Sequence, residues 1–181
     1  MHSKKLMLRR RTFLGAGLSA AMGATGVSCG GGGRGAGWRF FTAAEAQTVE
    51  AICEQIIPAD RDAGARRAGV VNYIDIQLTL HFKRYQKTYR LGVGAVDRAS
   101  RAKFGKRFAE LAADQQTEAL IDVEENSRAF FDLILTHTRQ GFYGDPRHGG
   151  NRDMASWKML GLPFPPVRGR QRYGEDQPLV G

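Results

Sequence analysis

The sequence is poor in the residues that build redox centres and metal sites. It contains two cysteines, Cys29 and Cys53, and no Cys-x-x-Cys-His motif that would attach a haem covalently. No Gly-x-Gly-x-x-Gly motif stands between a predicted strand and a predicted helix, so the pattern of a dinucleotide site is also missing. We therefore expect no catalytic, cofactor-binding or metal-binding residues in this chain.

Acidic residues are missing from the start of the chain, where none precedes Glu45. More than half of the net charge of +9 comes from five basic residues near the N-terminus: Lys4, Lys5, Arg9, Arg10 and Arg11. The other basic residues are spread along the chain, which is typical of solvated surface and not of a phosphate-binding track. Nothing in this distribution calls for a nucleic-acid partner.

The sequence also lacks an apolar run long enough to stay in a membrane. Residues 13–27 are apolar but rich in glycine, and they are shorter than the roughly 20 residues that a transmembrane helix needs. Arg10 and Arg11 precede Phe13 and Leu14 at the start of this run, which is the pattern of a twin-arginine export signal. We expect residues 1–29 to be a signal peptide that sends a folded protein to the periplasm.

The end of this segment is similar to a lipoprotein cleavage box, in which Cys29 would carry the lipid. Gly26 stands where leucine is usual, so cleavage by an ordinary signal peptidase, or no cleavage, remains an alternative. A lipid anchor would attach the protein to the inner membrane without spanning it. The glycine-rich residues 30–40 follow as a flexible linker.

The remaining chain has helical periodicity and no segment with the pattern of a strand. Thr42 and Glu45 form a capping-box pattern for a helix that ends near Ile57, before Pro58. Cys53 lies on the apolar stripe of this helix, which predicts a buried core residue. A disulfide to another chain is the alternative, because an odd thiol in an oxidising compartment is usually either buried or cross-linked.

Four further helices are expected before residue 140. They cover residues 70–78, residues 85–104 with a break or a bend at Gly92 and Gly94, a segment capped by Asp114 that reaches residue 123, and a segment after residues 126–127. The expected fold is an all-α, irregular helical bundle over residues 41–166 with a Gly/Pro-rich C-terminal loop region. A basic tail occupies residues 167–181.

Glycine and proline are concentrated after the last long helix. The pieces are Gly-Phe-Tyr-Gly-Asp-Pro at 141–146, Gly-Gly-Asn-Arg-Asp at 149–153, Trp157, and Gly-Leu-Pro at 161–163. So many glycines predict a loop of defined shape. We expect Asn151 to cap a short helix that carries Trp157 and ends at Gly161.

In this order the motifs resemble the small subunit of gluconate 2-dehydrogenase, known as subunit 3 or gamma. The similarity continues upstream through residues 50–60, 64–75 and 108–116, and thus spans nearly all of residues 41–164. His148 departs from the family pattern, which commonly has tyrosine at this point of the loop. The family resemblance predicts the fold, whereas the exact contacts of this loop do not follow from it.

The resemblance implies a noncatalytic subunit of a periplasmic, membrane-associated sugar or sugar-acid dehydrogenase. In such complexes a flavoprotein of the glucose-methanol-choline type binds FAD and oxidises the substrate, and a cytochrome c subunit with haem c passes the electrons to quinone. The small subunit assists maturation of the flavoprotein and can carry it through the twin-arginine pathway. FAD and haem c are therefore expected in the partner subunits.

Aromatic and basic residues near the C-terminal loop are candidates for contact with the flavoprotein. They are Phe142, Tyr143, Arg147, Arg152 and Phe164, with Trp157 expected in the core. The aromatic residues could instead seal the open end of the bundle.

The alternative function is a freestanding periplasmic enzyme or metal-binding protein that uses the region from His137 to His148. An imidazole and the Asp145 carboxylate near a rigid loop could serve either chemistry. The alternative, purely structural roles are a position on the last long helix for His137 and the cap of a turn for Asp145.

Overall fold

The structure is a computed structural model that describes residues 37–162. Several sequence predictions concern residues outside this range: the export signal with Arg10, Arg11, Phe13 and Leu14, the lipidation site Cys29, the interface residue Phe164 and the basic tail 167–181. The following description concerns the helical domain.

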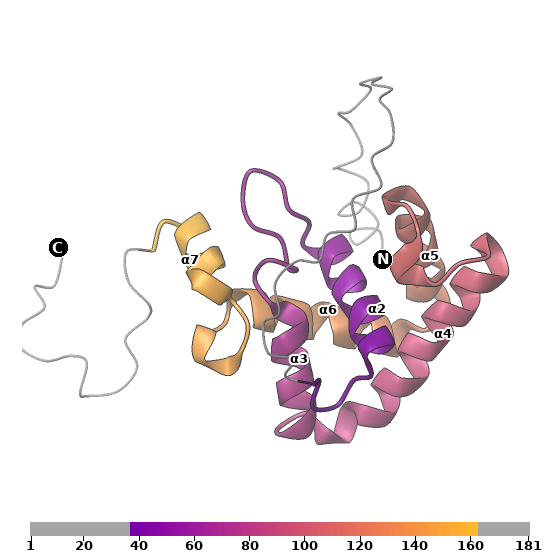
Figure 1. Ribbon diagram of the computed structural model, residues 1–181, viewed down its shortest axis with the longest axis horizontal. Coiled ribbons are helices and arrows are strands. Elements are labelled where there is room, and N and C mark those ends of the chain that lie inside the picture. The colour runs from indigo at the N-terminus through magenta and orange to yellow at the C-terminus, as the bar shows by residue number, and fades with distance from the viewer. Residues whose placement is uncertain (1–36, 163–181) are drawn as a thin grey trace, which may run out of the picture. The chain divides into compact units, whose positions relative to one another are not determined.

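Six α-helices make up the described part of the chain (Figure 1). They are α2 (Ala43–Ile56), α3 (Val70–Thr79), α4 (Gln86–Phe104), α5 (Ala113–Asn126), α6 (Arg128–Tyr143) and α7 (Ala155–Met159). Single 3-10 turns occur at η1 (Lys83–Tyr85), η2 (Phe108–Glu110), η3 (Pro146–His148) and η4 (Arg152–Met154). No strand occurs within residues 37–162, which confirms the all-α fold. None of these helices combines the length and apolar character required to cross a membrane.

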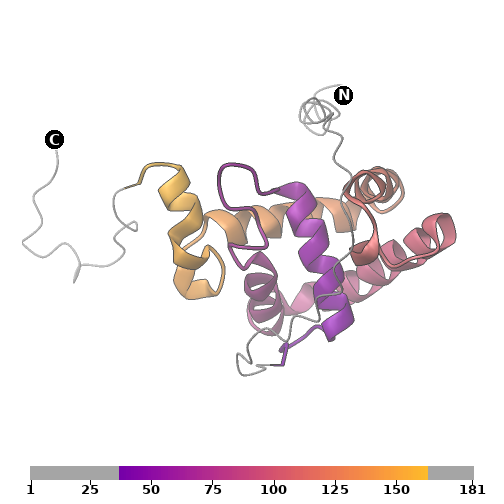
Figure 2. The same cartoon turned by 45° about the horizontal axis from the view of Figure 1, so that its top comes forward.

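Helix α2 lies in the middle of the domain and contacts α3, α4, α5 and α6 (Figures 1 and 2). Its first turn confirms the predicted capping box, since Thr42 Oγ1 accepts from the Glu45 N–H at 3.3 Å and Glu45 Oε2 accepts from the Thr42 N–H at 2.8 Å. These bonds satisfy two N–H groups that the helix itself cannot pair. The helix ends at Ile56, close to the predicted position.

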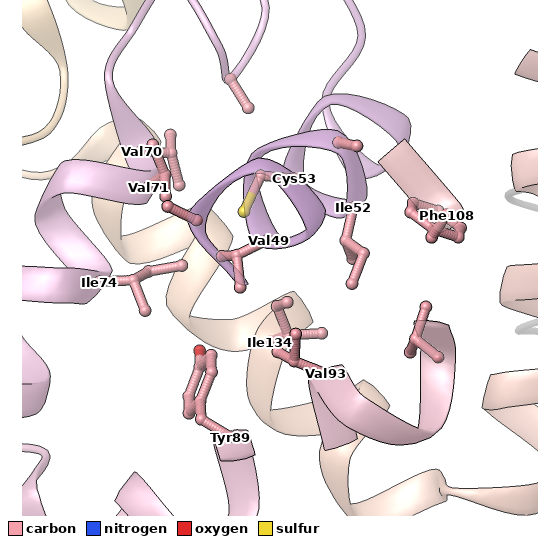
Figure 3. Packing of buried hydrophobic residues seen from close by; sticks show 14 of the residues in the cluster. Val49, Ile52, Cys53, Val70, Val71, Ile74, Tyr89, Val93, Phe108 and Ile134 are labelled. Carbon is pink, nitrogen blue, oxygen red and sulfur yellow. The ribbon is translucent and has the colours of Figure 1, made fainter. Parts of the chain in front are cut away.

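The core is built around the apolar face of α2 (Figure 3). Cys53 is 1% exposed, as predicted, and accepts a hydrogen bond from Thr138 Oγ1 at 3.2 Å. Burial raises the pKa of this thiol to about 12, so it stays protonated and unreactive near neutral pH. A side chain in this position cannot reach another chain, which argues against the intermolecular disulfide.

Two sequence expectations about helix geometry were wrong. Helix α4 is one continuous helix through Gly92 and Gly94, because Gly92 provides room for the Phe130 ring of α6 and does not break the helix. Helix α5 begins after Ala112, whose N–H donates to Gln115 Oε1 at 3.3 Å. Asp114 lies inside the first turn of α5 and not at its N-cap. In the first turn, its negative charge interacts favourably with the helix dipole.

A buried carboxylate fixes the segment that leads into α2. Asp75 in α3 is 2% exposed and accepts hydrogen bonds from three consecutive backbone N–H groups. The donors are Arg39 at 2.7 Å, Phe40 at 3.0 Å and Phe41 at 2.9 Å. Such multiple N–H donation compensates a carboxylate for its loss of water. Residues 39–41 are therefore held against α3.

The contact between Gly92 and Phe130 predicts a stability difference between two glycines of the same helix. Gly92→Ala would place a methyl group inside the Phe130 ring, and we expect a loss of about 1–3 kcal/mol in the free energy of unfolding. Gly94→Ala meets only the flexible end of Arg98, at 3.2 Å, and gains helix propensity of about 1 kcal/mol. Urea unfolding of both variants measures the difference, and equal stabilities would contradict the packing.

Candidate functional site

The C-terminal segment after α6 folds back onto α3. Asn72 Nδ2 of α3 donates to the Gly149 carbonyl at 2.7 Å, and the Arg152 N–H donates to the Ala68 carbonyl at 2.9 Å. Gly149 has φ +96°, and a side chain there would collide with Asn72 and Ile76. Close contact with α3 thus requires glycine at this point of the loop.

Asn151 is the central residue of this segment. Its side chain is fully buried, with Nδ2 donating to the Gly144 carbonyl at 2.8 Å and Oδ1 accepting from the Ser156 N–H at 2.9 Å. The second bond satisfies an N–H in the first turn of α7, as the sequence predicted, although the N-cap position of α7 is Met154. Helix α7 ends before Gly161, which has φ +68° and thus stops the helix as expected.

Three residues of the segment adopt left-handed backbone conformations without being glycine. They are Asn151 at φ 44°, Asp153 at φ 57° and Met154 at φ 56°. Left-handed backbone costs about 1–3 kcal/mol at a non-glycine residue and persists where surrounding contacts impose it. Here the bonds of Asn151 and the Arg152 N–H supply those contacts.

The two aromatic residues at the end of the bundle are core residues. Trp157 is 4% exposed, as expected, and its Nε1 donates to the Tyr143 carbonyl at 3.1 Å. Phe142 is fully buried, so its prediction as an interface residue was wrong: it lies on the inner face of α6, one turn after Thr138. These two side chains seal the bundle, whereas Tyr143 is 45% exposed and remains available for contact.

Exposed apolar side chains are concentrated around α7. We call them the α7 surface: Tyr143, Met154, Met159, Leu160 and Leu162, each 36–56% exposed. Other large exposed apolar residues are single ones distributed among the segment before α2, the end of α3, α4 and α5. Grouped apolar exposure is typical of an interaction site, whereas isolated exposed residues are ordinary.

The two predicted arginines differ in their surroundings. Arg147 forms an ion pair with Asp145, with 3.1 Å between Nε and Oδ2, and its N–H donates to Asp145 Oδ1. Asp145 thus caps the turn η3, which is the structural role predicted for it from the sequence. Arg152 is exposed, has no carboxylate partner within residues 37–162, and lines a cleft beside α3.

His137 lies inside the core and not at an open site. It is 3% exposed, its Nδ1 shares a hydrogen bond of 2.9 Å with the Tyr89 hydroxyl, and its ring stacks on Phe82 with 4.0 Å between centroids. Burial, with a smaller contribution from Arg84, lowers the pKa of His137 to about 4. The same burial raises the pKa of Tyr89 well above its usual value, so both groups are neutral at pH 7.

The remaining parts of the His137 to His148 region do not join it at a common site. His148 is exposed on η3, and Asp145 is engaged with Arg147. Within residues 37–162, no group of three or more histidine, cysteine or acidic side chains is placed to hold a metal ion. His137, Asp145 and His148 therefore do not form a common site for the alternative function.

The depressed pKa of His137 predicts a stability loss in acid. The unfolded chain binds this proton near pH 6.5 and the folded chain only near pH 4, so protonation favours unfolding as the pH falls between these values. We expect this residue to lower the free energy of unfolding by up to about 3 kcal/mol across that window. Denaturation of the wild type, His137→Gln and the exposed control His148→Gln at several pH values measures it. A His137→Gln profile as steep as the wild type would contradict the assignment.

Comparison with known proteins identifies the family. The family described as gluconate 2-dehydrogenase subunit 3 matches residues 43–163, a range that contains all six described helices and the α7 surface. No curated protein and no solved structure matches the chain. The family match covers well over half of the sequence and agrees with the motifs that the sequence presents. The chain therefore belongs to the gluconate 2-dehydrogenase subunit 3 family, whose members are subunits of a multi-subunit dehydrogenase.

Proposed function

We propose that this chain is the noncatalytic small subunit of a periplasmic, membrane-associated, FAD-dependent sugar or sugar-acid dehydrogenase. The observation that carries the proposal is the family match over residues 43–163. In the proposed complex the flavoprotein partner, of the glucose-methanol-choline type, binds FAD and oxidises the substrate. A cytochrome c subunit with haem c takes up the electrons.

The small subunit is proposed to assist maturation and export of the flavoprotein. Support comes from the twin-arginine pattern of Arg10, Arg11, Phe13 and Leu14, since that pathway translocates folded proteins. A flavoprotein that acquires FAD in the cytoplasm must cross the membrane already folded. One signal on the small subunit can then serve both chains. Attachment to the inner membrane would come from a lipid on Cys29 or from the complex itself.

The α7 surface is the proposed contact with the flavoprotein. It combines an exposed tyrosine with methionine and leucine side chains, and such residues make good interface anchors. The bonds of Asn151 and Trp157 fix the backbone beneath it. A surface held in place before binding loses less conformational entropy when the partner docks. Phe164 remains a proposed addition to this contact.

A freestanding enzyme or metal-binding protein is the weaker candidate. It would need His137 to be accessible, but this side chain is stacked on Phe82 and bonded to Tyr89 in the core. No feature of the described residues favours that function over the accessory role.

Co-export of the partner tests the proposed function. The chain is co-expressed with the flavoprotein subunit of the same organism, as wild type and as Arg10→Lys/Arg11→Lys, and the FAD content of periplasmic and cytoplasmic fractions is measured. We expect the flavoprotein to copurify with the wild-type chain from the periplasm and to remain in the cytoplasm with the double variant.

The matched control for this experiment is Arg9→Lys, which keeps the twin pair and should leave export unchanged. Export of the flavoprotein in the absence of the small chain would contradict the proposed role in export. Failure of the two chains to copurify would contradict the proposal that this chain is a subunit of the complex.

A further inference from the structure

A cleft of about 260 Å³ opens beside the first turn of α3. Three arginines line it, and they come from parts of the chain that are far apart in sequence: Arg39 before α2, Arg66 between α2 and α3, and Arg152 in the C-terminal segment. In Figure 1, α3 lies between α2 and the C-terminal segment that carries α7. The lining of the cleft thus contains three arginines that no single sequence motif brings together.

The acidic side chains of the cleft are already engaged. Glu50 pairs with Arg66, with 3.3 Å between Oε2 and Nε. Both oxygens of Asp75 accept backbone N–H groups of residues 39–41. The guanidinium groups of Arg39 and Arg152 form no ion pair with a carboxylate within the described range 37–162. The cleft therefore has cationic groups in excess of those that its own acids neutralise.

The backbone that carries these two arginines is fixed. The Arg39 N–H donates to Asp75 at 2.7 Å, and the Arg152 N–H donates to the Ala68 carbonyl at 2.9 Å. Gly69, at φ +69°, lies under the Arg152 guanidinium, and a side chain there would come within 3.2 Å of Nη2. The absence of a side chain at Gly69 leaves space for Arg152 over the start of α3.

We propose that this cleft binds a carboxylate side chain of the flavoprotein partner through Arg39 and Arg152. Guanidinium groups recognise carboxylates by paired, charge-assisted hydrogen bonds, and this geometry distinguishes arginine from lysine. The volume is below the roughly 300–1,000 Å³ of typical small-molecule pockets, and it leaves room for an aspartate or glutamate side chain. The inference rests on the proposed function, because the carboxylate belongs to that partner. It gives the interface a charged contact beside the apolar α7 surface.

Binding of the purified flavoprotein to the full chain tests the proposal. The dissociation constant is measured by biolayer interferometry for the wild type, for Arg39→Gln/Arg152→Gln and for the control Arg67→Gln/Arg98→Gln. Both control residues are exposed and outside the cleft. We expect the cleft variant to bind about tenfold more weakly or worse at low salt, with a smaller salt dependence, and the control to bind like the wild type. Circular dichroism melting checks that all variants fold.

The outcomes separate this inference from the proposed function. Equal affinity of the cleft variant and the wild type overturns the carboxylate site and leaves the complex intact. No binding by the wild type overturns both. A third arm titrates free gluconate into the isolated chain by calorimetry. Binding that disappears in the cleft variant would assign the site to a free sugar acid and overturn the partner contact, whereas no heat is the expected result.

Discussion

The amide of Asn151 is the interaction on which the C-terminal end of the domain depends. It joins the end of α6, through the Gly144 carbonyl, to the start of α7, through the Ser156 N–H. Together with the bond from the Arg152 N–H to the Ala68 carbonyl, these two buried bonds maintain the left-handed backbone at Asp153 and Met154. The amide therefore determines where α7 lies, and with α7 the exposed apolar residues around it.

The same segment also connects the apolar and charged parts of the proposed interface. Arg152 follows Asn151 directly, and its N–H is bonded to the Ala68 carbonyl ahead of α3. Asp75, farther along α3, holds the backbone of Arg39. An interface of this kind would combine apolar burial with a directional carboxylate contact, the first contributing most of the affinity and the second favouring one docking orientation. Both depend on contacts with a single helix, α3.

Local sequence signals predicted a large part of the fold. The capping box of α2 and the burial of Cys53 follow from spacing, and both were confirmed. The break considered for α4 was wrong: a glycine can interrupt a helix or make room for a neighbouring side chain, and Gly92 makes room for the Phe130 ring. Phe142 was assigned to the interface because it is an aromatic residue in the glycine-rich stretch near the C-terminal loop. Its i, i+4 spacing from Thr138 was the signal for a core position.

The site was less predictable than the fold. Asp75 bonds to groups 34–36 residues away, and the three arginines of the cleft come from three separate segments of the chain. No local sequence pattern predicts these long-range contacts, since they depend on how α3 packs against the rest of the domain. The glycines near Arg152 and Tyr143 did mark the tight turns of the C-terminal segment, whereas the role of both residues in an interface stays a prediction.

Hydrogen–deuterium exchange on the chain, alone and bound to the flavoprotein, tests whether the C-terminal segment and the Arg39 segment form the contact. We expect added protection at residues 143–162 and around Arg39, with little change in α5, which lies on the other side of α2 from α7 in both views (Figures 1 and 2). Added protection confined to α4 and α5, with residues 143–162 unchanged in the bound state, would contradict it.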